Sequence, residues 1–156
     1  MVAMTRRAKK ILAGVLAAIL ALLIVYFVWL KSSDTSRYFE YATYVDLKQD
    51  QTSTASAVPE FVPPSAKGIW GWYDMDFNVT ALEFEFNQAD HSSIVRTFHR
   101  VGGDQQVQIE RKVGSYNWKH QMPQGAGIEA FSRHQEGSEY LVLDRKTWRA
   151  YYVSEP

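Results

Sequence analysis

The hydrophobic residues of this chain form one continuous run near its start. Residues 11 to 30 read ILAGVLAAILALLIVYFVWL and contain no charged side chain. A helix rises about 1.5 Å per residue, so this run spans roughly 30 Å, the hydrocarbon thickness of a bilayer. A cleaved signal peptide has a shorter apolar core that ends in small residues, whereas this run ends in Val28, Trp29 and Leu30. The pattern therefore predicts an uncleaved transmembrane helix over residues 11–30.

The charges beside this run predict its orientation. Four basic residues and no acidic residue lie in residues 1–10. Lys31 and Arg37 follow the run, and Asp34 offsets part of their charge. Because basic flanks stay in the cytoplasm, we expect residues 1–10 to be a cytoplasmic tail of a bacterial inner-membrane protein. Everything after the span is then expected in the periplasm.

Small residues recur every four positions within the predicted span. The stripe consists of Ala13, Gly14, Ala17, Ala18 and Ala21. Such stripes let two membrane helices approach closely, which makes this one a candidate packing face. The alternative is the ordinary abundance of alanine in bacterial membrane spans.

Residues 31–66 change from a helical pattern to a linker composition. An apolar stripe at helical spacing predicts an amphipathic helix within residues 35–50, formed by Tyr38, Tyr41, Ala42 and Val45. The stretch QTSTASAVPEFVPPSA at 51–66 is rich in Ser, Thr and Pro, which favours a linker or an ordered loop.

From residue 67 onward, hydrophobic and polar residues alternate. Leu82, Phe84 and Phe86 fall on one face of a predicted strand, with Glu83 and Glu85 on the other. GIWGWYD at 68–74 is expected to pair with it as a hairpin. DHSSIVRTFHRVGG at 90–103 predicts an amphipathic helix. Three or four further strands are expected in VQIERKV, IEAFSRH, YLVLD and WRAYYV, the last two joined as a hairpin through residues 145–147.

This order of elements predicts an α+β fold. We expect an N-terminal transmembrane helix followed by a small, mainly antiparallel sheet with a helix packed on one face. The periplasmic domain is predicted to cover residues 67–156.

The composition indicates which cellular compartment and which classes of binding partner fit this chain. Residues 31–156 carry 13 basic and 17 acidic residues, a net charge of −4. This mildly acidic body argues against nucleic acid as a partner, because phosphate binding needs clustered cations. The chain has no cysteine, so it has no disulfide and no thiolate metal ligand. For an exported domain this favours a bacterial periplasm over a eukaryotic secretory route.

Part of the chain resembles a stretch found in short, uncharacterised bacterial proteins with a single membrane anchor. Their shared pattern is a YAT-x-x-D helix, a proline turn with Ser-Ala and Ile, and a D-x-D-x-N loop before an aromatic strand. The matching residues are Tyr41, Ala42, Thr43, Asp46, Pro59, Pro63, Ser65, Ala66, Ile69, Asp74, Asp76 and Asn78. The resemblance covers about a third of the chain and implies fold and location, without an activity.

Asp74, Asp76 and Asn78 have the alternating spacing of the first ligands in a calcium loop. Glu85 falls at the twelfth position of such a loop, but Val79 replaces the usual glycine at the sixth, and the flanks have strand periodicity. Three readings remain: a polar turn, which we favour, a looser cation site made by the three residues alone, and a true calcium loop. No cofactor is expected otherwise.

Paired aromatic residues mark the best candidate for a partner surface. Trp70, Trp72 and Tyr73 lie in one predicted strand, and if Ile69 faces the core, Trp70 and Trp72 share the opposite face. Exposed Trp and Tyr suit a protein interface. The alternative is that a second layer covers them, for example the segment at 35–48.

No local pattern indicates catalysis. The four histidines lack the spacing of a zinc helix motif, and Ser115 lacks the glycines of a nucleophile elbow. We therefore expect a non-catalytic module, bound to the lipid bilayer, that binds another envelope protein as an accessory component or an immunity-type partner. The alternative is a periplasmic receptor for a small ligand or cation that uses residues 74–78.

Overall fold

The computed structural model describes residues 15–16, 18–26, 36–50, 55, 58–134 and 138–156. The chain divides into two units, residues 1–35 and 36–156. In the first unit, residues 15, 16 and 18–26 are helical. Within the part of the chain that is described, no helix is both long and apolar enough to cross a membrane. The predicted tail at 1–10 and residues 11–14, 17 and 27–30 of the predicted span lie outside the described residues.

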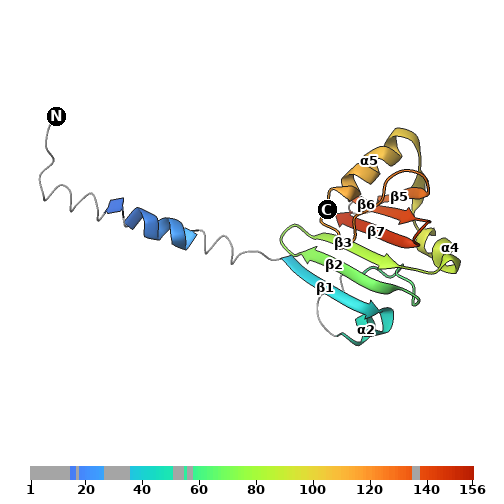
Figure 1. Cartoon of the computed structure of the whole chain (residues 1–156), viewed down its shortest axis with the longest axis horizontal. Coiled ribbons are helices and arrows are strands. Elements are labelled where there is room, and N and C mark those ends of the chain that lie inside the picture. Colours follow the sequence, from blue (N-terminus) through green and yellow to red (C-terminus); the bar gives the residue numbers. More distant parts are fainter. Residues whose placement is uncertain (1–14, 17, 27–35, 51–54, 56–57, 135–137) are drawn as a thin grey trace, which may run out of the picture. The chain divides into compact units, whose positions relative to one another are not determined.

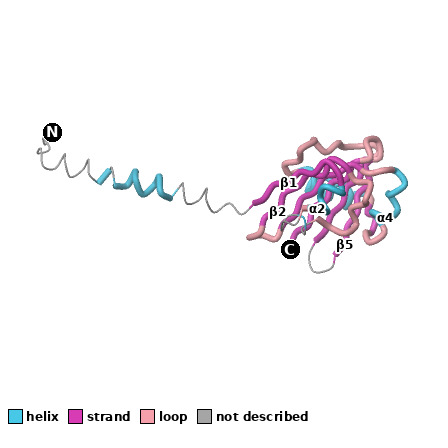
Figure 2. Tube along the Cα trace, turned by 90° about the horizontal axis from the view of Figure 1, so that it is seen from below, coloured by secondary structure: helices cyan, strands magenta, loops and turns pink. Residues whose placement is uncertain are grey.

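Residues 36–156 form one antiparallel sheet with the strand order β1-β2-β3-β7-β6-β5-β4 (Figure 1). The strands are β1 Ser36–Thr43, β2 Lys67–Asp74, β3 Val79–Glu85, β4 His99–Val101, β5 Ile128–His134, β6 Ser138–Asp144 and β7 Arg149–Glu155. The helices are α2 Tyr44–Gln49, α4 His91–Val95 and α5 Gly103–Gly114, and a 3₁₀ turn, η1, spans Gln88–Asp90. In Figure 2 the strands form one continuous layer with helices and loops around it. The α+β class and the antiparallel sheet are confirmed.

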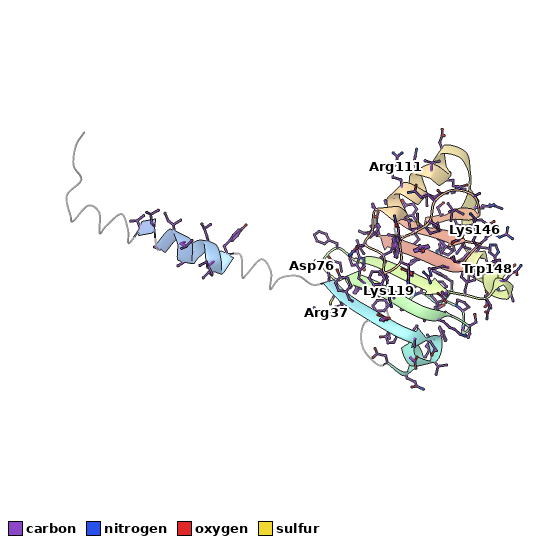
Figure 3. The ribbon with its side chains drawn as sticks, viewed as in Figure 1. Arg37, Asp76, Arg111, Lys119, Lys146 and Trp148 are labelled. Carbon is purple, nitrogen blue, oxygen red and sulfur yellow. The ribbon has the colours of Figure 1, made fainter. Side chains whose placement is uncertain are left out.

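Both predicted hairpins are present. β2 pairs with β3 through residues 75–78, and β6 pairs with β7 through residues 145–148. Asn78 and Trp148 adopt φ angles of 50° and 54° at the ends of these turns. β1 pairs with β2 so that Ser36 lies opposite Asp74, and Figure 3 shows Arg37 and Asp76 at this same end of the sheet.

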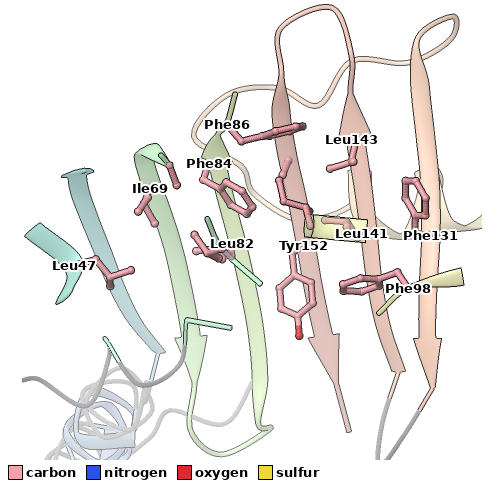
Figure 4. Close-up of a cluster of buried hydrophobic side chains, with 14 of the residues drawn as sticks. Leu47, Ile69, Leu82, Phe84, Phe86, Phe98, Phe131, Leu141, Leu143 and Tyr152 are labelled. Carbon is pink, nitrogen blue, oxygen red and sulfur yellow. The ribbon is translucent and has the colours of Figure 1, made fainter. Parts of the chain in front are cut away.

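Two hydrophobic clusters lie on opposite faces of the sheet. The first contains Phe39, Ile69, Leu82, Phe84, Leu141 and Tyr152, packed against Leu47 of α2 and Ile94 of α4 (Figure 4). The second contains Ala81, Val142, Tyr151 and Val153, packed against Ile109 and Val113 of α5. The prediction of a helix on one face is therefore incomplete, because both faces are covered.

The predicted amphipathic helix at the start of this unit is wrong over most of its length. Residues 36–43 are strand β1, in which Phe39 is buried between the exposed Tyr38 and Glu40. The helix begins only at Tyr44, because Thr43 and Asp46 form a capping box. β1 pairs with β2 along one side of its backbone, and the folded unit therefore begins at Ser36 instead of residue 67.

Two further elements differ from the prediction. VQIERKV at 107–113 belongs to helix α5, where Ile109 and Val113, four residues apart, are buried while Val107 is 54% exposed. The helix predicted at 90–103 is shorter, since only residues 91–95 are α-helical and 99–101 form the edge strand β4. In the proline-rich stretch, Val62 and Ala66 are buried, and residues 58–66 pack as a loop on the first cluster.

Candidate functional site

Five aromatic rings form a connected row on one face of the sheet, which we call the aromatic surface. It consists of Tyr38 from β1, Trp70 and Trp72 from β2, and Tyr116 and Trp118 from the segment after α5. The ring centroids of Trp70 lie 6.3 Å from Tyr38 and 6.4 Å from Trp118. Tyr116 lies 6.0 Å from Trp72 and 6.3 Å from Trp118. Two distant parts of the sequence therefore build one surface.

The shared orientation of Trp70 and Trp72 follows from strand alternation and is confirmed. Ile69 is fully buried in the cluster on the other face, and Gly71 lies against Phe39 there. Tyr73 does not belong with the two tryptophans, because it follows Trp72 by one position and so projects from the opposite face. Its hydroxyl lies 3.5 Å from Asn78 Oδ1, beside the turn.

The covering layer comes from residues 115–118 instead of the predicted segment at 35–48. The Trp118 ring meets Tyr151 edge-on at 5.3 Å, and its indole N–H donates to the Val113 carbonyl at 2.8 Å. The Tyr116 hydroxyl donates to Glu155 at 2.5 Å. These contacts hold the layer against β7. Trp70, Trp72, Tyr116 and Trp118 are half-buried as a result.

One ring of the surface remains largely open to solvent. Tyr38 is 66% exposed, and it lies on β1, the last strand at its end of the sheet order. Beside it, Glu40 on the same strand accepts a hydrogen bond from Lys119. The aromatic surface thus has a half-buried centre and a solvent-exposed edge at Tyr38 and Glu40.

A buried carboxylate lies under the centre of this surface. Glu83 on β3 is 1% exposed and lies opposite Trp70 in the strand register. Its two oxygens bind the backbone N–H of His120 at 3.1 Å and the His120 Nδ1 at 2.5 Å. Arg149 Nη1 lies 3.5 Å away. A buried charge needs such partners, so Glu83 ties the segment after α5 to the sheet.

The charge of Glu83 also affects a neighbouring phenol. Burial, together with repulsion of the phenolate by the carboxylate of Glu83, raises the pKa of Tyr151 to about 12. Tyr151 is therefore a neutral, packed residue at physiological pH. The carboxylate–histidine pair acts here as a structural clamp.

Two histidines form hydrogen bonds with buried glutamates. His120 binds Glu83, and His91 Nε2 binds Glu129 Oε2 at 2.7 Å. Glu129 is also buried and is approached by Arg100 at 3.1 Å. His99 is exposed on β4.

Residues 74–78 form a turn stabilised by their own side chains. Asp74 Oδ1 accepts hydrogen bonds from the backbone N–H groups of Asp76 at 3.0 Å and Phe77 at 3.2 Å, and Asp74 Oδ2 lies 3.4 Å from Ser36 Oγ. This is the polar turn that the sequence favoured. Among the residues described, no group of three or more His, Asp or Glu side chains is placed to hold a metal ion.

Glu85 takes part in a different interaction from the one a calcium loop requires. It lies at the far end of β3 from the turn and forms an ion pair with Arg149. Its distance along the strand separates it from Asp74, because each extended residue advances about 3.3 Å.

An open groove of about 710 Å³ lies on the other face, between residues 59–64, α4 and the sheet. Among its lining residues, Glu139 accepts hydrogen bonds from Arg133 and, at 2.8 Å, from the Tyr152 hydroxyl. Arg133 also donates to Thr97 Oγ1 at 2.9 Å. This network was not predictable from the sequence, because its four members lie on three different strands and on the segment before β4.

We expect the Glu139 network to make stability fall in acid. Burial raises the pKa of Glu139, but the hydrogen bonds from Arg133 and Tyr152 outweigh burial and bring it below its ordinary value of 4.5. A lowered folded-state pKa stabilises the fold above the unfolded pKa, and this contribution is lost as pH falls through the folded pKa. Glu139→Gln should therefore lower the free energy of unfolding by about 1–3 kcal/mol at pH 7, and by less as the pH falls below 4.5.

Urea unfolding at several pH values measures this effect, with Glu60→Gln at an exposed position as the control. A deficit in Glu139→Gln that stays the same from neutral to acid pH would show that the charge of Glu139 is not its source.

The small-residue stripe falls only partly within the described helix. Ala18 and Ala21 are exposed there, whereas Ala13, Gly14 and Ala17 lie outside the described residues.

Comparison with known proteins gave no relative. No protein-family model, no curated protein and no solved structure matches the chain.

Proposed function

We propose that this chain is a non-catalytic, membrane-anchored periplasmic module that binds another envelope protein through the aromatic surface. The twenty-residue uncharged run and the basic residues before it support the anchor and its orientation. The partner is a component of an envelope complex, or a protein whose action this module blocks in the manner of an immunity protein.

The observation that carries the proposal is the exposure of Tyr38 beside a fixed aromatic row. Tyr and Trp are enriched at the centres of interfaces because each buries a large apolar area while keeping a polar group available. Tyr38 is 66% exposed and is continuous with the half-buried Trp70. A partner that covers Tyr38 would therefore complete the burial of the whole row.

The anchoring of the aromatic surface favours tight binding. Trp118 is held by Val113 and Tyr151, and Tyr116 is held by Glu155. Side chains that are already ordered lose less conformational entropy on association than free ones do. The rim pair of Glu40 and Lys119 gives the partner a polar contact next to the rings.

We expect Tyr38→Glu to abolish recovery of the partner without unfolding the protein. The substitution places a charge within the proposed apolar contact, and the exposed position leaves the core intact. Substitution of a residue that contributes strongly to an interface costs about 2–4 kcal/mol, so affinity should fall by at least tenfold. The measurement is a quantitative pull-down of the full-length tagged chain from native membranes, with co-purifying proteins identified by mass spectrometry.

Val107→Glu is the matched control, since Val107 is 54% exposed on α5 and lies outside the aromatic surface. Partner recovery that is equal for Tyr38→Glu, Val107→Glu and the unchanged chain would remove the aromatic surface as the binding site. Absence of any stoichiometric protein, together with stabilisation by calcium or a small ligand, would favour the receptor reading instead.

A further inference from the structure

The turn between β2 and β3 carries two large apolar side chains that are mostly exposed to solvent. We call residues 74–78 the hairpin tip. Phe77 is 70% exposed, the largest fraction among the exposed large hydrophobic residues of the described chain, and Met75 is 57% exposed. A turn needs Asp, Asn or Gly for its backbone geometry, and Asp74 and Asn78 already supply this. Met75 and Phe77 therefore need a different explanation.

Strand register places the hairpin tip beside the first residue of β1. Ser36 lies opposite Asp74, and the Ser36 hydroxyl approaches the Asp74 carboxylate at 3.4 Å. Adjacent strands lie about 5 Å apart, so the hairpin tip and the start of β1 occupy the same end of the sheet. Figure 3 shows Asp76 and Arg37 together at this end.

Chain length links this end of the sheet to the uncharged run. Only residues 31–35 separate Leu30 from Ser36. A fully extended chain advances at most about 3.5 Å per residue, so Ser36 lies within about 20 Å of the end of that run. The headgroup layer on one side of a bilayer is about 5–8 Å thick. If residues 11–30 cross the bilayer, the hairpin tip is thus within reach of its outer surface.

We propose that the hairpin tip inserts Met75 and Phe77 into the outer headgroup region of the membrane that holds residues 11–30. The proposal rests on the proposed anchor and adds a second, reversible lipid contact to it. Apolar side chains at the headgroup boundary contribute to binding in proportion to the area they bury. Two contact points would fix the tilt of the domain and the height of the aromatic surface, which begins nearby at Tyr38, opposite Trp72.

The charges at this end indicate which lipids the contact uses. Asp74 and Asp76 are acidic, and one Asp74 oxygen is bonded within the turn. Arg37 is the neighbouring cation on β1 and is exposed. An end with two acids and one base has no polybasic character, so attraction to anionic lipid does not drive the contact. The insertion should therefore be at least as strong in zwitterionic vesicles as in vesicles that contain anionic lipid.

The absence of cysteine from the chain allows a direct test in the full-length protein. Met75→Cys is labelled with an environment-sensitive nitrobenzoxadiazole dye and reconstituted into phosphatidylcholine vesicles, with or without phosphatidylglycerol. The control is Val45→Cys, because Val45 has a matching exposure of 58% and lies in α2, after the opposite end of β1. Val45 and Met75 are therefore separated by the length of that strand.

We expect the dye at position 75 to be blue-shifted, quenched by lipid-attached nitroxide and protected from aqueous iodide in both kinds of vesicle. The dye at position 45 should be quenched only by iodide. Adding Phe77→Ser to Met75→Cys should reverse most of the blue shift, because the neighbouring apolar anchor is removed. Circular dichroism of each variant checks that the sheet is retained.

Two results overturn the inference. The first is equal iodide quenching at positions 75 and 45, and the second is protection of position 75 that requires a co-purified protein. Carbonate extraction of the same vesicles tests the membrane anchor separately from the hairpin-tip contact. A chain that resists extraction while position 75 stays in water contradicts only the hairpin-tip contact. A chain that is extracted contradicts the proposed anchor itself.

Discussion

Gly71→Ala is expected to destabilise residues 36–156 severely. A Cβ atom at position 71 would lie 2.5 Å from Cζ of Phe39 and 2.7 Å from the backbone oxygen of Ala81. Phe39 is buried, and the Ala81 oxygen belongs to the neighbouring strand β3, so neither can yield without disturbing the core or the sheet. Overpacking of a core costs about 1–3 kcal/mol, and a clash with backbone belongs at the upper end. The measurement is the urea midpoint of the full chain in detergent.

Gly102→Ala is the matched control for this prediction. No heavy atom lies within 4 Å of a Cβ at position 102, and its φ of −148° suits any residue. This variant should unfold within about 0.5 kcal/mol of the unchanged chain. Equal midpoints for Gly71→Ala and Gly102→Ala would show that β1 does not pack on β2 as described.

Leu20→Asp combined with Leu23→Asp is expected to release the protein from the membrane. An aspartate near the centre of a spanning helix costs about 2.5–3.5 kcal/mol on the insertion scale, so two of them reverse the preference for the bilayer. Both positions lie in the helical stretch at 18–26 and in the middle of the uncharged run. Carbonate extraction followed by quantification of the pellet measures the effect.

The same positions changed to valine provide the control, because valine keeps the run apolar. We expect the valine variant to remain fully in the pellet and the aspartate variant to move to the supernatant. If the aspartate variant also stays in the pellet, the uncharged run is not what holds the protein to the membrane.

Strict alternation and local turn chemistry made the hairpins predictable. The strand with Leu82, Phe84 and Phe86 follows a period of two, and Asp74 and Asn78 supply the hydrogen bond and the positive φ that its turn needs. The β6–β7 hairpin is similarly local. A strand that pairs with the next strand along the chain can be predicted from the sequence, because the turn between the two sets their register.

The predictions for β1 and α5 were wrong because their hydrophobic residues fit both the helical period of about 3.6 residues and the strand period of two. Tyr38, Tyr41 and Val45 have helical spacing, yet the residue of β1 that is buried in the core is Phe39. In α5, Val107 and Ile109 alternate as a strand would, while the buried pair is Ile109 and Val113. Tertiary packing determines whether such a segment becomes a helix or a strand, and a short stretch of sequence does not contain that information.

Only the part of the candidate site that lies on a single strand, β2, was predictable from the sequence. Alternation placed Trp70 and Trp72 on one face, but the residues that complete the aromatic surface, Tyr116 and Trp118, come from more than forty positions later. A sheet with a single covered face would leave Glu83 in solvent, because it lies on the opposite face of β3 from Leu82 and Phe84. With both faces covered, Glu83 is buried and needs His120 and Arg149 as partners.

The central claim is that residues 36–156 lie outside the cytoplasm and are held at the membrane by an uncleaved transmembrane helix at residues 11–30. Single-cysteine variants test it most directly, with Thr5→Cys in the basic tail and Val107→Cys at an exposed position of α5, both treated with a membrane-impermeant maleimide. The account predicts that position 107 is modified in intact spheroplasts and that position 5 is modified only after lysis. Modification of position 5 in intact spheroplasts, protection of position 107 there, or loss of position 5 from the mature protein would contradict it.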